Sequence, residues 1–386
     1  MSTPKRLSFN RNEAGGALGD LGTFVPLLVG MVSLCGLQLG PALFTSGLMN
    51  VLSGIAFGIP MPVQPMKAIA AVAIDEGLNE AQILTAGIAT GAVILLMGVT
   101  GLIDWLARHL PKSLVRGLQL ALGLKLLTKG IAMIAGTNVL LGWDSIGLGI
   151  GAALLILGLY ASRRYPSALI VFGVGLLALL LARPGVTAEL TLGTRWYLPD
   201  LTRWTDWQSG LLRGAVPQIP LTILNSVIAV CALSFDLFPQ RGAPPRRVAI
   251  SVGLMNLFVC PLGGMPVCHG AGGLAAQYRF GARTGGAVLM LGVAKMVLAL
   301  SFGTSLAVIL QAYPQSVLGA LLLFGGVELA LVCRDQTART DFFVMLLTAS
   351  VCLAINTAVG FVVGWLVAAL LLAKYVRIES PRAADR

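Results

Sequence analysis

Two short stretches combine polar side chains with helix-breaking residues inside long apolar regions. The first, GIPMPVQPMKAIAA from Gly58, carries three prolines and Lys67, and the second, GGMPVCHGAGGLAA from Gly263, carries His269. Proline and glycine interrupt helices, and a charged side chain in hydrocarbon is costly and marks a functional site by default. Each stretch therefore predicts a short helix that begins inside the membrane, with free N–H groups and a partial positive charge at its start.

Two such helix starts that face each other predict an anion-binding site. Lys67 lies in the first turn of one helix, where a cation opposes the helix dipole unless an anion binds nearby. The candidate substrate-binding residues are Gln64, Lys67, Cys268, His269, Gly270, Gln218, Asn225 and Ser226. The alternatives are that Lys67 snorkels or pairs with Asp20, that His269 is a buried, hydrogen-bonded histidine, and that the amides and hydroxyls only join helices.

Two acids lie inside apolar segments, Asp20 in LGDLGTF and Glu328 in GGVELAL. Such acids are functional candidates, and with His269, which exchanges protons near neutral pH, they are the candidate carriers of a coupling proton. Glu328 occupies the repeat position of Lys125, which makes a salt bridge between them an interpretation to test. The alternative is that both side chains reach the membrane surface, and sodium as the coupling ion stays open.

The composition indicates the class of protein that holds these residues. Of the 386 residues 56% are hydrophobic and 11% are charged, whereas a soluble protein has about 25% charged residues. Apolar runs of about 20 residues recur along the whole chain, which predicts an all-α polytopic membrane protein. The net charge of +11 fits basic cytoplasmic loops better than a nucleic-acid partner. We expect no signal peptide, metal, disulfide or other cofactor.

The apolar windows predict about fourteen membrane segments, of which the third and tenth are too short to cross. The excess of Lys and Arg falls on the cytoplasmic side if both termini are cytoplasmic, which predicts a multi-pass protein of the cell membrane. Trp196, Trp204 and Trp207 in the long outer loop fit an interfacial belt. The segments lie near 17–34, 40–57, 64–75, 81–103, 112–128, 145–161, 166–182, 212–233, 246–261, 268–278, 285–303, 314–332, 341–355 and 357–375.

The two halves of the chain resemble each other. GLMN ends at Asn50 and again at Asn256, MPV ends at Val63 and again at Val267, and LPKSLVRGLQLALGLKL from Leu110 matches YPQSVLGALLLFGGVEL from Tyr313. Seven segments per half is an odd number, so the second half enters from the opposite side as an inverted repeat, with the two half-helices meeting at the midplane. The predicted units are residues 1–182, an outer loop 183–211, residues 212–377 and a cytoplasmic tail 378–386, with no soluble domain after it.

Four of these stretches resemble the molybdate transporter family of the sulfate permease superfamily: GALGDLGTFVPLLVG, PMPVQPMKAIAAVA, PQIPLTILNSVIAV and GGMPVCHGAGGLAAQYRFGARTGG. The resemblance implies a core domain of segments 1–4 and 8–11 and a gate domain of segments 5–7 and 12–14. It also implies import of molybdate or sulfate with protons, by an elevator-like movement. A homodimer in the lipid bilayer is implied only by relatives.

Other functions fit the sequence less well. An anion channel on the same scaffold stays open, because sequence does not report turnover. A nucleobase or bicarbonate carrier is a further alternative, in which Lys67 argues against a neutral nucleobase, since that substrate needs acids and amides. An enzyme is disfavoured because the chain has no HExxH, GxSxG or Walker A pattern. The preference for molybdate over sulfate rests on the resemblance alone.

Overall fold

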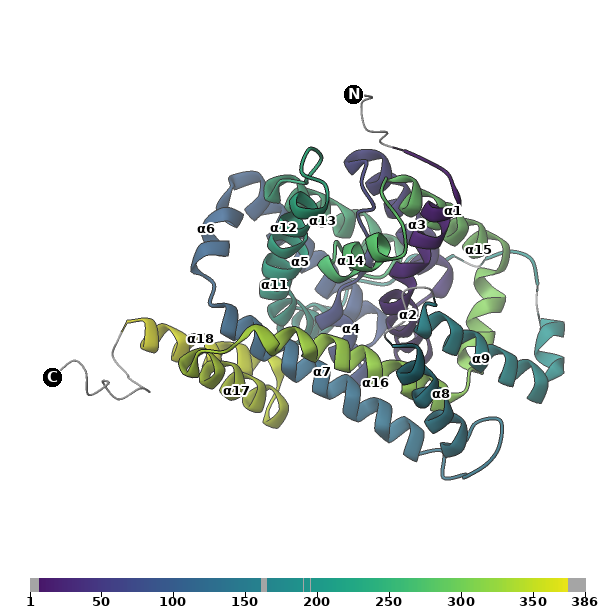
Figure 1. Cartoon of the computed structure of the whole chain (residues 1–386). Coiled ribbons are helices and arrows are strands. Elements are labelled where there is room, and N and C mark those ends of the chain that lie inside the picture. The colour runs from purple at the N-terminus through teal and green to yellow at the C-terminus, as the bar shows by residue number, and fades with distance from the viewer. Residues whose placement is uncertain (1–6, 161–164, 190, 195, 374–386) are drawn as a thin grey trace.

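The computed structural model describes residues 7–160, 165–189, 191–194 and 196–373, without the side chains of 106–108 and 189. Most of these residues are helical, and they include one two-stranded sheet (Figure 1). Seven helices or continuous helical stretches are long and apolar enough to cross a membrane, and three more are shorter and apolar. The predicted tail 378–386 lies outside the described residues.

The first half follows the predicted segments closely. Its first span is continuous from Arg11 to Cys35, and the third is the predicted half-helix, α4. A short amphipathic helix, α6, is an addition that the apolar windows did not predict. The elements are α1 (Arg11–Ala17), η1 (Leu18–Asp20), α2 (Leu21–Cys35), α3 (Leu39–Phe57), β1 (Gln64–Pro65), α4 (Lys67–Glu76), α5 (Glu80–Thr100), α6 (Leu102–His109), α7 (Lys112–Ala135), α8 (Ile146–Leu159) and α9 (Ser167–Ala182).

The second half repeats this order. Its first span runs from Trp204 to Leu237 and contains two π-helical stretches, because Pro217 and Pro220 remove backbone donors from the helical ladder. The elements are η2 (Pro184–Glu189), α10 (Trp204–Ser209), η3 (Gly210–Ala215), α11 (Val216–Leu221), η4 (Thr222–Ala229), α12 (Val230–Leu237), α13 (Pro245–Val259), η5 (Cys260–Leu262), β2 (Val267–Cys268), α14 (Ala271–Arg279), α15 (Gly286–Gln311), α16 (Gln315–Leu331), η6 (Val332–Asp335), α17 (Arg339–Ala354) and α18 (Thr357–Leu372).

The two half-helices meet, as predicted. Strand β1, which leads into α4, pairs antiparallel with β2, which leads into α14, and Gln64 lies opposite Cys268. The N–H of Met66 also donates to the carbonyl of Pro266 over 2.9 Å. This ladder satisfies backbone groups that helix-breaking residues leave open, which is the condition for irregular backbone at membrane depth.

Long helices from opposite halves pack in pairs: α3 on α15, α5 on α13, and α7 on α16. Glycine allows the close approach, because a Cβ on Gly47 would lie 2.7 Å from the Gly292 carbonyl, and one on Gly123 would lie 2.6 Å from the Gly326 carbonyl. In Figure 1, α7, α16, α17 and α18 lie together on one side of the molecule, away from α5, α12 and α13. Half-helix α4 packs on α7 and α5 of these pairs, whereas α14 packs on η1, α12 and α1.

Candidate functional site

A buried hydrogen-bond cluster joins the first span to the paired strands. The Gln64 amide nitrogen donates to Asp20 Oδ1 and to Thr23 Oγ1, each over 2.6 Å. Asp20 is fully buried in the 3₁₀ turn between α1 and α2, and its second oxygen, Oδ2, has no partner among the described residues. Asp20 does not form an ion pair with Lys67 there, so a carboxylate oxygen remains available for a proton or a donor.

The start of α14 is an open helix N-terminus. Gly270 is its N-cap, and within the described residues no group accepts from the backbone N–H groups of Ala271, Gly272 and Gly273. The Lys67 ammonium lies beside this turn, since a Cβ built on Gly272 would lie 3.9 Å from Lys67 Nζ. In the described part of the chain Lys67 forms neither a hydrogen bond nor an ion pair. Free N–H groups and a free cation thus face the same space.

The start of α4 is already capped. Gln218 Oε1 accepts from the N–H groups of Ala68 and Ile69 over 2.8 and 3.3 Å, and its amide nitrogen donates to Thr222 over 2.9 Å. The side-chain oxygen of Gln218 therefore occupies the position that an anion would take on this helix. The two half-helix starts are unequal, with α14 open and α4 closed.

His269 is held by the protein on both ring nitrogens. Its Nδ1 lies 2.8 Å from the carbonyl of Pro62, and its Nε2 lies 2.9 Å from Ser251 Oγ. Because a carbonyl only accepts, Nδ1 carries the hydrogen and Nε2 accepts from the hydroxyl. The ring also packs edge-on against Phe57, with 5.4 Å between centroids. The arrangement matches the alternative reading of a buried, satisfied histidine.

The remaining predicted residues lie around the paired strands. Cys268 is buried in β2, where its thiol interacts with the hydroxyl of Ser226 from η4. Asn225 is half-buried on η4 and has no hydrogen bond within the described residues. A Cβ on Gly270 would collide with Gln64 Oε1, so a larger residue there would displace the Gln64 side chain. Cys268 and Gly270 thus lie next to Gln64, and Ser226 lies beside Cys268.

Lys295 belongs to this cluster, although the sequence analysis gave it no role. It is 3% exposed on α15, its ammonium donates to Asn50 Oδ1 over 2.9 Å, and it lies 3.4 Å from the centroid of the Phe24 ring. It also interacts electrostatically with Asp20. Its position inside an apolar segment was the signal that would have identified it. Gln277, fully buried on α14 beside Asp20, was missed as well.

Lys125 and Glu328 have separate partners rather than each other. Lys125 Nζ lies 2.7 Å from Glu76 Oε1 and 3.2 Å from Asp75 Oδ2, at the end of α4. Glu328 is exposed on α16 and accepts from the Tyr160 hydroxyl over 2.6 Å. The repeat positions are therefore equivalent in sequence without forming a salt bridge in this structure.

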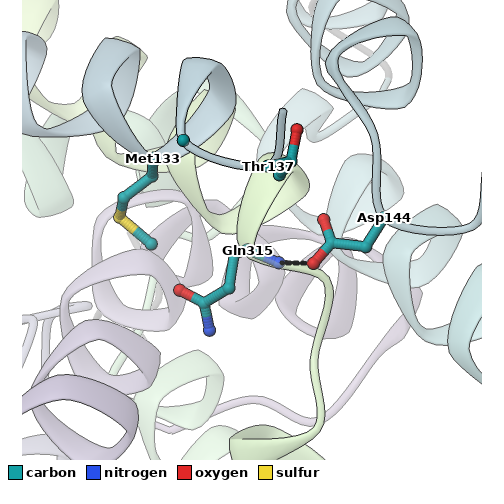
Figure 2. Close-up of a pocket in the computed structure, with 5 residues that line it drawn as sticks. Met133, Thr137, Asp144 and Gln315 are labelled. Atoms are coloured by element: carbon teal, nitrogen blue, oxygen red, sulfur yellow. Dashed lines mark hydrogen bonds between the residues drawn. The ribbon is translucent and has the colours of Figure 1, made fainter. Parts of the chain in front are cut away.

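One cavity lies away from this cluster, where α7 ends and α16 begins. Figure 2 shows Met133, Thr137, Asp144 and Gln315 around it. The Asp144 carboxylate accepts from the N–H groups of Gln315 and Ser316 over 3.0 and 2.9 Å, which caps α16. The carboxylate already fills the helix start, so this cavity offers no free anion site.

Comparisons with known proteins agree with this architecture. The chain matches the family described as "Molybdate transporter of MFS superfamily" over residues 12–126 and 210–329. It is 41% identical to molybdate transporter 1 of Arabidopsis thaliana over 91% of this chain and 86% of that protein. It is 39% identical to molybdate transporter 1 of Chlamydomonas reinhardtii over 97% and 93% of the two chains.

Two solved structures share the fold. The murine solute carrier 26 family member A9 anion transporter in the inward-facing state has a TM-score of 0.70 and 16% identity, over 97% of this chain and 70% of that one. The transmembrane domain of the cyanobacterial bicarbonate transporter BicA has a TM-score of 0.65 and 14% identity, over 92% and 97%. Both likenesses support the inverted-repeat membrane fold.

Proposed function

We propose that this chain, which belongs to the molybdate transporter family, imports molybdate with protons as a secondary transporter. The observation that carries this proposal is the open N-terminus of α14 beside the free ammonium of Lys67. A tetrahedral dianion accepts hydrogen bonds from several directions, so it suits three backbone N–H groups and one ammonium around a single space.

The closed start of α4 supports a single anion position. Gln218 caps Ala68 and Ile69, so the donors at that helix are already used. The anion would lie on α14, where Gly270 and Gly272 let it approach the backbone. Lys67 would then extend from α4 across to the anion and join the two half-helices. Cys268, Ser226 and Asn225 line the neighbouring wall in this proposal.

Asp20 is our candidate for the proton carrier. It is fully buried, it has a free Oδ2, and it is connected by Gln64 to the strand that opposes Cys268. We assign His269 a positioning role, because both of its ring nitrogens are engaged. Glu328 is the second candidate carrier, and its exposed position on α16 makes it the weaker one.

We further propose an elevator movement of a core domain, residues of α1–α5 and α10–α15, against a gate domain of α7–α9 and α16–α18. The pairs α3 with α15 and α5 with α13 lie within the core, and α7 with α16 lies within the gate. Half-helix α4 packs on gate helix α7, whereas α14 packs on α1, η1, α12 and η4 of the core. With cytoplasmic termini, this asymmetry supports a state that is closed outside and open inside.

The proposal is tested by uptake of labelled molybdate into liposomes that contain the purified protein. We expect uptake that increases with an inward proton gradient and resists excess sulfate. Equal competition by sulfate would indicate a general oxyanion carrier, and single-channel currents would indicate a channel. Liposomes without uptake of either anion would refute the proposed function.

A further inference from the structure

The buried lysine Lys295 is the least expected charge in the molecule. It lies on α15 within the cluster that holds Asp20, and its near contacts are one amide oxygen and one aromatic ring, from Asn50 and Phe24. An amide and a ring do not neutralise a buried ammonium, and a lysine is almost never fully buried unless it is paired. Asp20 lies four residues before Phe24, about one helical turn away, and is the acid with which Lys295 interacts electrostatically.

The inverted repeat shows that packing alone does not require this lysine. Asn50 and Asn256 are equivalent through the GLMN motif, and Asn256 holds strand β2 by bonds to the N–H and carbonyl of Val267, over 2.9 and 2.7 Å. Asn50 instead gives its Oδ1 to Lys295, and its Nδ2 has no partner among the described residues. Lys295 lies against Gly47, where a Cβ would be 3.0 Å from the Cβ of Lys295, and at the equivalent Gly253 the neighbour is the apolar Leu95.

Three charged side chains form one cluster beside the proposed anion position, and Glu328, exposed on α16, is a further acid that interacts electrostatically with Lys67. Lys67 comes from α4, Lys295 from α15 and Asp20 from η1, and the thiol of Cys268 on β2 is the other titratable group that interacts with Asp20. With both lysines charged and Asp20 ionised, the cluster has a charge of +1, and a bound dianion makes it −1. One proton on Asp20 brings the loaded cluster to zero, which is the favoured charge in a low-dielectric interior.

We propose that Lys295 is a positioning residue that acts through Asp20, as its fixed counter-cation, so that one proton enters with each dianion. This inference rests on the proposed function and sets the ratio of transported protons to dianions at one to one. The proton adds to the free Oδ2 of Asp20 when the dianion binds, and it leaves to the cytoplasm when the dianion leaves. The lysine keeps the empty carrier from holding an unpaired carboxylate.

The test compares the pH profile of molybdate uptake in Lys295→Met, Lys295→Arg and the double variant Asp20→Asn/Lys295→Met. Without the cation, Asp20 binds its proton at higher pH, so the midpoint of uptake moves about one pH unit to the alkaline side in Lys295→Met. Lys295→Arg restores the wild-type profile, and the double variant has no pH dependence. Lys129→Met, a lysine on α7 away from the cluster, is the matched control and keeps the wild-type midpoint.

An unchanged midpoint in Lys295→Met would overturn the inference. If Lys295→Met does not yield folded protein, recovery of folded, molybdate-binding protein in the double variant supports the charge pair. Equal loss in both variants overturns it, because Lys295 would then act only through Asn50 and Phe24. If the wild-type protein shows no uptake, the proposed function fails. The charge pair between Lys295 and Asp20 is then tested by melting temperatures, and it stands only if the double variant is more stable than Lys295→Met.

Discussion

Gln64 and Cys268 face each other across a two-residue antiparallel ladder, although 203 positions separate them in the chain. Each residue lies at the start of a half-helix, so this pairing fixes the two helix starts relative to each other. It also aligns the Gln64 side chain, which donates to Asp20 on one side and lies against Gly270 on the other. The buried acid and the open start of α14 are thereby connected through one side chain.

The space around Gln64 admits no further atom at Gly273. A Cβ there would lie 2.5 Å from Gln64 Nε2 and 2.7 Å from Asp20 Oδ1, so Gly273→Ala displaces both side chains. Overpacking of this kind costs about 1–3 kcal/mol, and we expect molybdate affinity to fall at least about tenfold. Equilibrium binding to the purified protein measures this. Gly22→Ala is the control, because no atom of the described residues around it lies within 4 Å of a Cβ at Gly22; equal effects of the two substitutions would contradict the account.

The proton carrier is identified by comparing Asp20→Asn with Glu328→Gln. Uptake that needs a protonated Asp20 decreases as pH rises, and Asp20→Asn, which is always neutral, removes that decrease. Glu328 is exposed and bonded to Tyr160, so Glu328→Gln keeps the wild-type dependence. Initial rates of uptake are measured from about pH 5 to about pH 8, because buried acids titrate in this range. A flat profile for Glu328→Gln with a normal profile for Asp20→Asn would assign the proton to Glu328.

The ion pairs of Glu76 hold α4 to its neighbours. Glu76 binds Lys125 of α7 at 2.7 Å and Arg213 of η3 at 2.9 Å, and the Lys125 and Glu76 side chains are 10% and 16% exposed. Breaking a pair as buried as this costs about 3–5 kcal/mol, because it leaves a charge without a partner. We expect Lys125→Met and Glu76→Gln each to lower the melting temperature, and the double variant to lose less than their sum.

The pair between Arg116 and Asp335 is the control for that prediction. Its side chains are 20% and 44% exposed, and an exposed pair contributes about 0–1 kcal/mol. Both of its residues lie in the proposed gate, so Arg116→Met leaves the rate of uptake unchanged, whereas Lys125→Met changes it. If the decreases in melting temperature for Lys125→Met and Glu76→Gln add up in the double variant, and uptake does not change, then this contact does not join the proposed core and gate domains.

Much of the fold was predictable from the sequence because its signals are local. The lengths of the apolar runs predicted the membrane spans. The repeated GLMN and MPV motifs predicted the inverted repeat and the contact between the two half-helices. The continuation of the second-half entry span from Trp204 was less visible, since the polar residues of WTDWQSG precede its apolar run. The amphipathic α6 has too little apolar length to appear in a window chosen for membrane spans.

The site was only partly predictable, because side-chain partners depend on contacts between distant segments. The sequence places Gln218 and His269 near the helix breaks, and it does not reveal that Gln218 caps α4 or that Pro62 and Ser251 hold the imidazole. Lys295 was visible as an intramembrane charge. Its place near Asp20 follows from the packing of α1 and α2 on α15, which no local pattern reports.

The central claim is that an anion binds between Lys67 and the start of α14. The most direct test is equilibrium binding of labelled molybdate to the purified wild-type protein and to Lys67→Met, with Lys129→Met as the matched lysine control. A hydrogen bond to a charged group contributes about 1.5–3 kcal/mol, so the account predicts a loss of affinity of about ten- to a hundredfold for Lys67→Met only. Wild-type affinity in a folded Lys67→Met protein would contradict it.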